Sequence, residues 1–505
     1  MTRQGVNTVP MLITLDLDRG SATLHLQVYR ALRSAILQGR LAAGTRLPGS
    51  RVLAEDLRVS RMTILTAYDQ LKAEGFVEAH GGGGTRVSTS MRAWQTATEH
   101  APDRPITSSS TSAARLSSLG AKMLAAFGES SPQHLLRRSV PFALGVPALD
   151  AFPVETWARL TTRRWRTTPR AMLSPDDGPG FAPLRDAIAE YVVNARAVRC
   201  TRDRIVITAG AQQAIDLIAR LLLNPGDEVW VEEYGYRPAR AAFAGVGAIP
   251  VQISMDDEGL DVEQGQHRAP GARLAFVTPA CGAPFGVRMS LRRRLALLDW
   301  AHQTGAWIVE DDYNGELSYE GRPLAALQGM EHPGAERVIY LRTFTKTLFP
   351  ALRLGYAVLP LEFVEPFVRA RVIADRHSPI AEQAVLADFM TEGHFARHVR
   401  NMRELYASRQ RVFLRLAAAE VGELLQFSSA PAGLRLVGRL QPGMSDQHIA
   451  MEAAGRGIIV DTLSAHAAGS PEAQGLVFGY VPFGPDETRR ALAELAEVIR
   501  SVRNA

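Results

Sequence analysis

Cysteine and long apolar runs are nearly absent from this chain of 505 residues. Its two cysteines, Cys200 and Cys281, lie far apart, which argues against a disulfide framework or a cysteine-rich zinc site, predicts no metal centre, and favours a reducing cytoplasm. The short apolar patch at residues 9–13 soon meets Asp16 and Asp18, so we expect neither a secretory signal nor a membrane span.

Lysine is also scarce: Lys72, Lys122 and Lys346 are the only three, although lysine and arginine together number 57. A lysine that stands alone in the last three quarters of the chain indicates a place where arginine cannot serve. Schiff-base formation is such a place, because a primary amine condenses with an aldehyde whereas a guanidinium keeps its proton and does not. The alternative is an ordinary surface lysine.

The length and composition describe a globular protein of several domains. A chain of 505 residues predicts two to four domains, and 46% hydrophobic with 22% charged residues is ample for a core. Residues 1–90 hold eleven Lys/Arg against seven Asp/Glu, which is most of the net charge of +5. A basic N-terminal module suits a phosphate-bearing partner, although charged faces are often only solvated.

Residues 24–88 predict three helices followed by a β-hairpin. Apolar residues recur every four positions in the first helix, which should end near Gly39. Ser50 is expected to cap a second, short helix and Ser60 a third. Alternating residues on both sides of the glycine run 81–84 indicate two strands joined by a turn. This order is that of a winged helix.

The remaining chain predicts a linker and then an α/β domain. Residues 89–140 are rich in Ser, Thr, Ala and Pro and are expected to form a linker, with a helix near 116–127. Helical segments then alternate with buried strands, which predicts a mostly parallel, doubly wound sheet with a smaller C-terminal lobe. The expected strands are 204–208, 228–231, 248–253, 273–278, 307–310, 338–341 and 355–359, and in the small lobe 434–437 and 476–479.

Three features meet at the strand ends of that sheet. Lys346 follows one strand, and the acidic run 310–312 follows another. The small-residue turn at 208–213 leads into a helix whose N-terminus suits a phosphate. Pyridoxal phosphate needs an amine for its aldehyde, an acid for its ring nitrogen and donors for its phosphate, so these features together indicate that cofactor.

With these motifs, residues 141–505 resemble the fold-type I aminotransferases. Residues 46–51, 59–64 and 75–77 with the glycine wing are similar to a GntR-type winged helix. The whole chain therefore resembles MocR-type transcriptional regulators, with a DNA-binding domain at 1–88, a linker at 89–140 and an aminotransferase-like effector domain at 141–505.

The resemblance implies a role for each candidate site residue. Lys346 would form the internal aldimine, Asp311 would keep the pyridinium protonated, and Tyr313 would donate to the ring hydroxyl. Tyr236 would stack on the ring, and the phosphate would be bound by Ala211, Gln212, Thr343 and Arg353. An acidic loop, a core tyrosine and a surface arginine are the plain alternatives.

The winged helix is expected to bind double-stranded operator DNA. The helix after Ser60 would enter the major groove, with Arg61 on a guanine edge and Thr63 on a phosphate or a thymine methyl. Arg46 and Arg51 would contact the backbone, and glycines of the wing, Gly83 among them, would approach the minor groove. The alternative is a helical protein-interaction domain.

The chain also departs from the aminotransferase pattern. The loop Thr278–Gly286 lacks the polar residues expected beside the ring, and Tyr234 stands where proline is common. Residues 476–480 lack the arginine that usually binds the substrate carboxylate, for which Arg435 on a neighbouring strand is a candidate substitute. Cys281 is expected to be a small buried residue. These changes leave cofactor binding in place and put transamination in doubt.

The sequence thus favours a pyridoxal-phosphate-binding regulator that senses the cofactor itself or a small amine or amino acid. The resemblance to fold-type I enzymes, whose sites usually lie at a subunit boundary, implies a homodimer, and its symmetry implies paired DNA half-sites. One alternative is an aminotransferase with an accessory DNA-binding domain, and another is a scaffold with an empty pocket. The effector and the operator are not predicted, because function belongs to the site and not to the scaffold.

Overall fold

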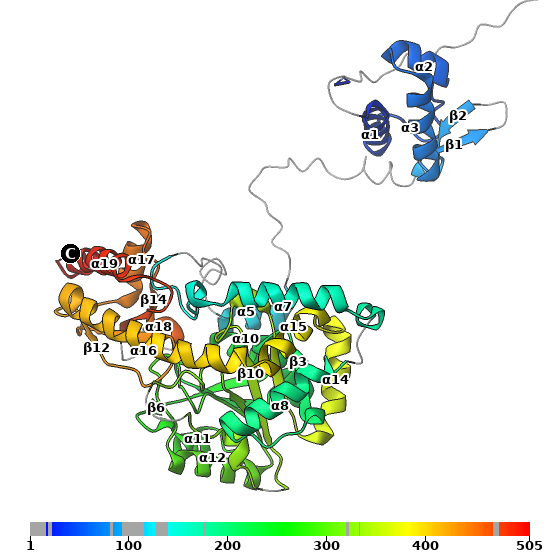
Figure 1. Cartoon of the computed structure of the whole chain (residues 1–505). Helices are drawn as coiled ribbons and strands as arrows, with labels where there is room; N and C mark the ends of the chain where they lie inside the picture. The colour runs from blue at the N-terminus through cyan, green and yellow to red at the C-terminus, as the bar shows by residue number, and fades with distance from the viewer. Residues whose placement is uncertain are drawn as a thin grey trace, which may run out of the picture. The chain divides into compact units, whose positions relative to one another are not determined.

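The computed structural model describes residues 17–18, 23–80, 84–92, 116–127, 140–174, 178–319, 323–332, 334–467 and 474–504 (Figure 1). The chain divides into two compact units, Met1–Arg115 and Leu116–Ala505. Most of the expected linker at 89–140, and Gly83 of the wing, lie outside the described residues.

The first unit has the predicted helix, helix, helix and hairpin order. Val28, Ile64 and Leu71 are fully buried between its helices, and the two strands pair antiparallel with Val77 opposite Val87. Its elements are α1 (Leu24–Leu37), α2 (Ser50–Leu57), α3 (Arg61–Ala73), β1 (Val77–His80) and β2 (Gly84–Val87).

The two helix caps differ from each other. Ser60 caps α3 as expected, because its hydroxyl accepts from the Thr63 N–H at 3.1 Å. The expectation for Ser50 is wrong: Gly49 has the extended backbone of the cap position, and Ser50 is already the first helical residue. Its hydroxyl instead accepts from Arg61 Nε at 3.3 Å, which links α2 to the start of α3.

The second unit is built on a seven-stranded sheet in which all seven predicted strands are present. The strand order is β3-β11-β10-β9-β8-β4-β5, and every neighbouring pair is parallel except those made by β11. The strands are β3 (Ile205–Thr208), β4 (Glu228–Glu232), β5 (Ile249–Ile253), β8 (Leu274–Val277), β9 (Trp307–Asp311), β10 (Val338–Thr343) and β11 (Gly355–Val358).

Helices cover both faces of this sheet, as a doubly wound fold requires (Figure 1). Val206 packs toward one group of helices, while its neighbours Ile205 and Ile207 pack toward the other. On one face lie α9 (Ala211–Leu222), α10 (Arg237–Gly245) and α14 (Leu361–Asp375). On the other lie α8 (Ala182–Arg196), α11 (Val262–Arg268), α12 (Leu291–Thr304) and α15 (Ile380–Thr391).

The smaller C-terminal lobe is an antiparallel sheet covered by helices, and it contains both strands expected there. Phe413, Phe478 and Ile499 are in its core. The sheet order is β12-β13-β15-β14. The elements are α16 (His394–Val421), β12 (Leu425–Phe427), β13 (Arg435–Leu440), α17 (Asp446–Gly455), β14 (Asp461–Thr462), α18 (Leu463–His466), β15 (Gly475–Gly479) and α19 (Pro485–Asn504).

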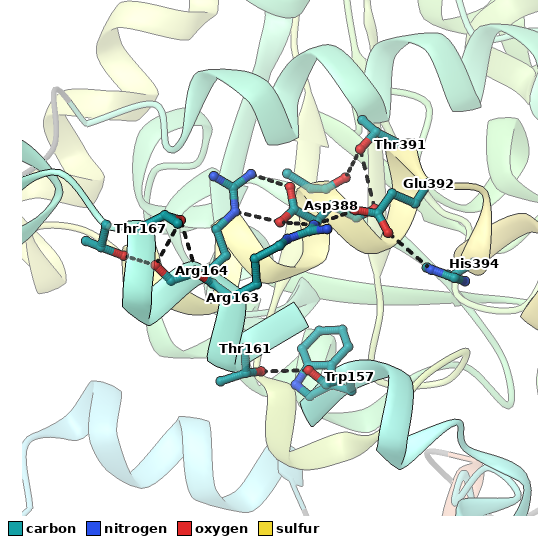
Figure 2. Close-up of polar contacts among 11 residues, drawn as sticks. Trp157, Thr161, Arg163, Arg164, Thr167, Asp388, Thr391, Glu392 and His394 are labelled. Atoms are coloured by element: carbon teal, nitrogen blue, oxygen red, sulfur yellow. Dashed lines mark hydrogen bonds and ion pairs between the residues drawn. The ribbon is translucent and has the colours of Figure 1, made fainter. Parts of the chain in front are cut away.

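Helix α7 (Val154–Thr167) is fastened to α15 by arginine–carboxylate contacts, which Figure 2 shows. Arg164 Nε lies 2.6 Å from Asp388 Oδ2, and Arg163 Nη2 lies 2.8 Å from the same oxygen. Arg163 also pairs with Glu392, whose other oxygen is 3.3 Å from His394. These contacts hold α7 against α15 of the sheet domain.

Short elements complete the unit. Helix α5 (Ser118–Phe127) packs on α10, since a methyl group added at Gly245 would lie 3.3 Å from Met123. None of the helices in the described part of the chain is long and apolar enough to cross a bilayer. The remaining short elements of the second unit are β6 (Met255–Asp256), β7 (Gly259–Leu260), α13 (Leu327–Met330) and the 3-10 turns Leu149–Ala151, Arg170–Leu173, Arg202–Arg204 and Pro350–Leu352.

Candidate functional site

The register of the sheet brings distant strand ends together. Gly355 at the start of β11 pairs with Thr343 on one side and with Thr208 on the other. On the next strands, Leu341 pairs with Asp311. A cavity of about 370 Å³, a size typical of small-molecule sites, opens beside these ends. Its lining includes all eight predicted cofactor residues: Ala211, Gln212, Tyr236, Asp311, Tyr313, Thr343, Lys346 and Arg353.

The amine of Lys346 points into this cavity. Its Nζ donates to the Gly145 carbonyl at 2.9 Å. Burial, together with the positive charges of Arg435 and Arg353, lowers the pKa of Lys346 to about 8, while Asp311 acts in the opposite direction. The amine is therefore uncharged, and able to attack an aldehyde, at a much lower pH than a solvated lysine.

This lowered pKa predicts a pH profile for cofactor attachment. When cofactor-free protein is mixed with pyridoxal phosphate, the rate at which the lysine-bound absorption band appears should rise with pH and level off above about 8. A solvated lysine such as Nα-acetyl-lysine should require about pH 10. Stopped-flow absorbance from about pH 6 to pH 10 at constant ionic strength measures this. A midpoint equal to that of the free lysine would contradict the buried amine.

The three consecutive acids after β9 have three different surroundings. Glu310 accepts from the Leu327 N–H at 2.8 Å. Asp312 is as deeply buried as Glu310, and its Oδ2 forms an ion pair with Arg196 Nε at 2.8 Å. Asp311 is the one that lines the cavity, and its buried Oδ1 has no hydrogen-bond partner.

An orphaned carboxylate oxygen is costly to bury, and it fits a ligand that brings a donor or a positive charge. Burial, with the nearby carboxylates of Asp312 and Glu232, raises the pKa of Asp311 to about 7, whereas Lys346 opposes the shift. A protonated ring nitrogen would supply the missing partner, so this residue fits the pyridinium of pyridoxal phosphate.

The other end of the cavity has the features of an anion site. Helix α9 begins at Ala211, and the Gly210 before it has a φ of 105°, a conformation that favours glycine. Arg353 donates to the Ala209 carbonyl at 2.9 Å, and a methyl group at Gly210 would lie 3.4 Å from its guanidinium. The N-terminus of α9 and a guanidinium thus lie close together beside the cavity, an arrangement that suits a phosphate.

The side chains of Thr343 and Gln212 also lie at the anion-binding end of the cavity. Thr343 is buried, with its hydroxyl 2.9 Å from that of Thr345. Gln212 donates to the Pro238 carbonyl at 3.0 Å, while its buried Oε1 has no partner. A phosphate accepts from the hydroxyls and from the amides at the start of α9, so these residues fit its binding.

Both candidate tyrosines reach the cavity, in different ways. Tyr236 precedes α10 and is 38% exposed, which leaves its ring free to stack. Tyr313 donates to the Cys281 carbonyl at 2.9 Å, so it would have to exchange that partner to meet a ring hydroxyl. Cys281 is buried, and burial raises the pKa of its thiol to about 11, in keeping with a small core residue.

The altered loop at 278–286 is held from beneath by a buried acid. Glu232 accepts from both the N–H and the hydroxyl of Thr278, at 2.8 and 2.6 Å. Ala280, Cys281 and Ala283 are buried behind it. Of this loop, Thr278 and Ala283 line the cavity, so the loop brings neither an imidazole nor an amide side chain to the site, as the sequence indicates.

Sequence reasoning missed residues that come from distant segments. Gly145 is positioned by its neighbours: the Gly479 N–H bonds to Phe142 O at 3.0 Å, and the Ala148 N–H bonds to Tyr406 at 3.1 Å. Asp461 and His466 of the small lobe also line the cavity, 3.1 Å apart. No sequence motif marks these positions, because only the packing of the small lobe against the sheet domain brings them to the cavity.

The expected DNA-contacting side chains are available at the surface of the first unit. Arg46, Arg51 and Arg61 are exposed, and Thr63 is half-buried with its hydroxyl 2.8 Å from that of Ser60. A methyl group at Gly84 of the wing would lie 3.1 Å from Arg46 Nε, which places this arginine beside the hairpin. Gly83 cannot be placed, because it lies outside the described residues.

Comparison with known proteins agrees with both halves of this picture. Residues 24–87 match the bacterial regulatory proteins of the gntR family, and residues 142–456 match aminotransferase class I and II. The probable rhizopine catabolism regulatory protein MocR of Rhizobium meliloti is 37% identical over 98% of this chain and 97% of its own length. The chain belongs to the MocR-type transcriptional regulators.

Other relatives of this MocR-type regulator agree. The uncharacterized HTH-type transcriptional regulator YhdI of Bacillus subtilis is 30% identical, over 96% of this chain and 98% of its own. Among solved structures, the α-aminoadipate aminotransferase LysN of Thermus thermophilus, complexed with N-(5'-phosphopyridoxyl)-L-leucine, is 25% identical with a TM-score of 0.70, covering 76% of this chain and 97% of that one. The predicted fold is confirmed, and pyridoxal phosphate is supported as the cofactor.

Proposed function

We propose that this MocR-type regulator holds pyridoxal phosphate on Lys346 and changes its binding to operator DNA when pyridoxal phosphate, or a small amine, occupies the site. The observation that carries the proposal is the unpartnered Asp311 oxygen in the cavity that also contains the Lys346 amine. The cofactor, when bound, supplies an aldehyde that a primary amine can engage in place of lysine. That exchange releases the lysine amine and needs no oxidant or reductant.

A ligand alters DNA binding only if it prefers one of two arrangements of the protein. We propose a cytoplasmic homodimer, because a two-fold assembly presents two winged helices to paired half-sites. The test is fluorescence anisotropy on the intergenic DNA next to the gene, with protein free of cofactor, loaded with it, and loaded plus a panel of amines. DNA binding that none of these states changes would refute the sensor proposal.

A second candidate function is transamination, favoured by the lowered pKa of Lys346. A neutral lysine beside the reacting carbon is a competent base for a proton shift. Repeated conversion of the loaded protein to its pyridoxamine form by an amino acid, with turnover restored by a keto acid, would establish an enzyme. Slow conversion in a single round would leave the regulator proposal standing.

Arg61 is the residue from which we expect the largest effect on sequence recognition. Arg61→Ala should weaken specific DNA binding by about 1–3 kcal/mol, because a bidentate contact to a guanine edge is lost. Arg51→Ala should weaken all sequences alike and lower the salt slope by about one phosphate contact. The control is Arg30→Ala, which removes an exposed arginine from α1. Equal losses for Arg30 and Arg61 variants would contradict the assignment of α3 as the reading helix.

A further inference from the structure

Helix α5 lies within the stretch 89–140 that the sequence predicts as a linker. In the sequence, residues 93–115, which lie outside the described residues, join this helix to the winged helix. The last residue of α5, Phe127, lines the cavity that contains the Lys346 amine. The predicted linker therefore contributes a side chain to the wall of the ligand cavity.

Helix α10 is the support on which α5 packs, and it reaches the same cavity. Residues 236–238, at the start of α10, line the cavity. At the other end of α10, a methyl group built on Gly245 would lie 3.3 Å from Met123. A methyl group built on Gly247, just beyond the helix, would lie 3.3 Å from Leu119. The two helices therefore run antiparallel, and the end of α5 meets the cavity where α10 begins.

Packing holds α5 on one side only. No residue of α5 is buried, although the helix is apolar and Lys122 is its single charged residue. Leu119 and Met123, which pack at the end of α10, are still 38% and 40% exposed, and Leu124 is 52% exposed. A helix that buries so little apolar surface separates from its support at a small cost in free energy. Its position is therefore one that a bound ligand is able to shift.

We infer that α5 transmits the state of the cavity to the DNA-binding unit: a ligand that contacts Phe127 favours α5 docked on α10. Docking of α5 then fixes the point at which the chain leaves the second unit toward the winged helix. The inference rests on the proposed function, since it assumes that DNA binding responds to the ligand. Its physical basis is linkage, because a cavity whose wall includes Phe127 binds its ligand more tightly when that wall is in place.

A reversible covalent lock between α5 and α10 is the first test. A β-carbon built on Gly245 would lie 3.5 Å from Met123 Cβ, which is within the range that a disulfide spans. In the Met123→Cys/Gly245→Cys protein, oxidised glutathione should join the two thiols and dithiothreitol should separate them. Met123→Cys alone, treated in the same way, controls for oxidation of the native Cys200 and Cys281.

The lock should separate ligand binding from the DNA response. The probes are pyridoxal phosphate alone, and pyridoxal phosphate with glycine, β-alanine or ethylamine. The oxidised protein should keep the absorbance changes that these probes cause in wild-type protein. Its DNA affinity should change by less than about twofold, whereas at least one probe should change that of wild-type and reduced protein by about fivefold or more.

Phe127→Ala tests the coupling without a lock, and Leu124→Ala is the matched control from the exposed side of the same helix. Coupling is reciprocal, so operator DNA should shift the midpoint of the absorbance titration by the factor by which the probe shifts DNA affinity. In Phe127→Ala protein, the midpoints measured with and without DNA should coincide. In Leu124→Ala protein, they should differ as they do in wild-type protein.

The possible failures are distinguishable from one another. If none of the probes changes DNA binding by wild-type protein, the proposed function fails and this inference fails with it. If the locked protein responds as wild-type protein does, or if the two thiols do not join, the function stands and the inference is overturned. If Phe127→Ala no longer binds pyridoxal phosphate, Phe127 belongs to the cofactor site and not to the coupling, which also overturns the inference.

Discussion

Lys346→Ala protein is expected to lose the absorption band of lysine-bound cofactor completely. Borohydride should leave no pyridoxyl group on it, because alanine has no amine and the chain contains only two other lysines. Basal DNA binding should remain, since the winged helix belongs to the other unit. The response of DNA binding to amines should disappear. Absorbance, mass spectrometry of the reduced protein and DNA anisotropy measure the three effects.

Because the chain has only three lysines, substitution of another lysine serves as the control. Lys122 is exposed on α5, and Lys122→Ala should keep the band, the adduct and the DNA response. Lys346→Arg separates charge from chemistry, because it keeps a cation in the cavity but cannot condense with an aldehyde. A reduced adduct of wild-type yield on Lys346→Ala, found on Lys72 or Lys122, would refute the assignment of Lys346.

The pattern of the sequence was sufficient for the architecture. Buried β-rich runs alternate with helical segments, and only a doubly wound sheet covers both faces of such strands. The same pattern indicated that Lys346 and the acidic run lie at strand ends, which the register of β9 and β10 confirms. Periodicity succeeded here because it reports which faces are buried.

The sequence could not rank the three acids at 310–312 by their own pattern, because their difference is tertiary. Arg196, 116 residues away in the sequence, donates a hydrogen bond to Asp312, and a backbone N–H of α13 donates one to Glu310. Only the resemblance to the aminotransferases points to Asp311 among the three. Ser50 shows the same limit on a smaller scale: serine suits a helix cap, but the backbone angles of Gly49 decide where the helix starts.

Asp311→Asn is expected to weaken cofactor binding by about 10- to 100-fold, because a charge-assisted hydrogen bond to the ring nitrogen is worth about 1.5–3 kcal/mol. The cofactor-free protein should not lose stability. The pKa of Asp311 is raised from 3.8 to about 7, so between these pH values the folded state keeps a proton that the unfolded state has released. Stability then falls as pH rises through this window, and Asn should make that fall shallower.

Asp312→Asn, one residue away, is expected to give the opposite pair of results. It removes the negative charge that lies 2.8 Å from the buried Arg196 and 3.3 Å from the buried Arg342. The free energy of unfolding should therefore fall by about 3 kcal/mol. Glu316 still pairs with Arg342, so Arg342 keeps one carboxylate partner and contributes less to the loss of stability. Chemical denaturation and cofactor titration on both variants separate the roles. Tight cofactor binding by Asp311→Asn, with loss in Asp312→Asn, would transfer the ring-nitrogen contact to Asp312.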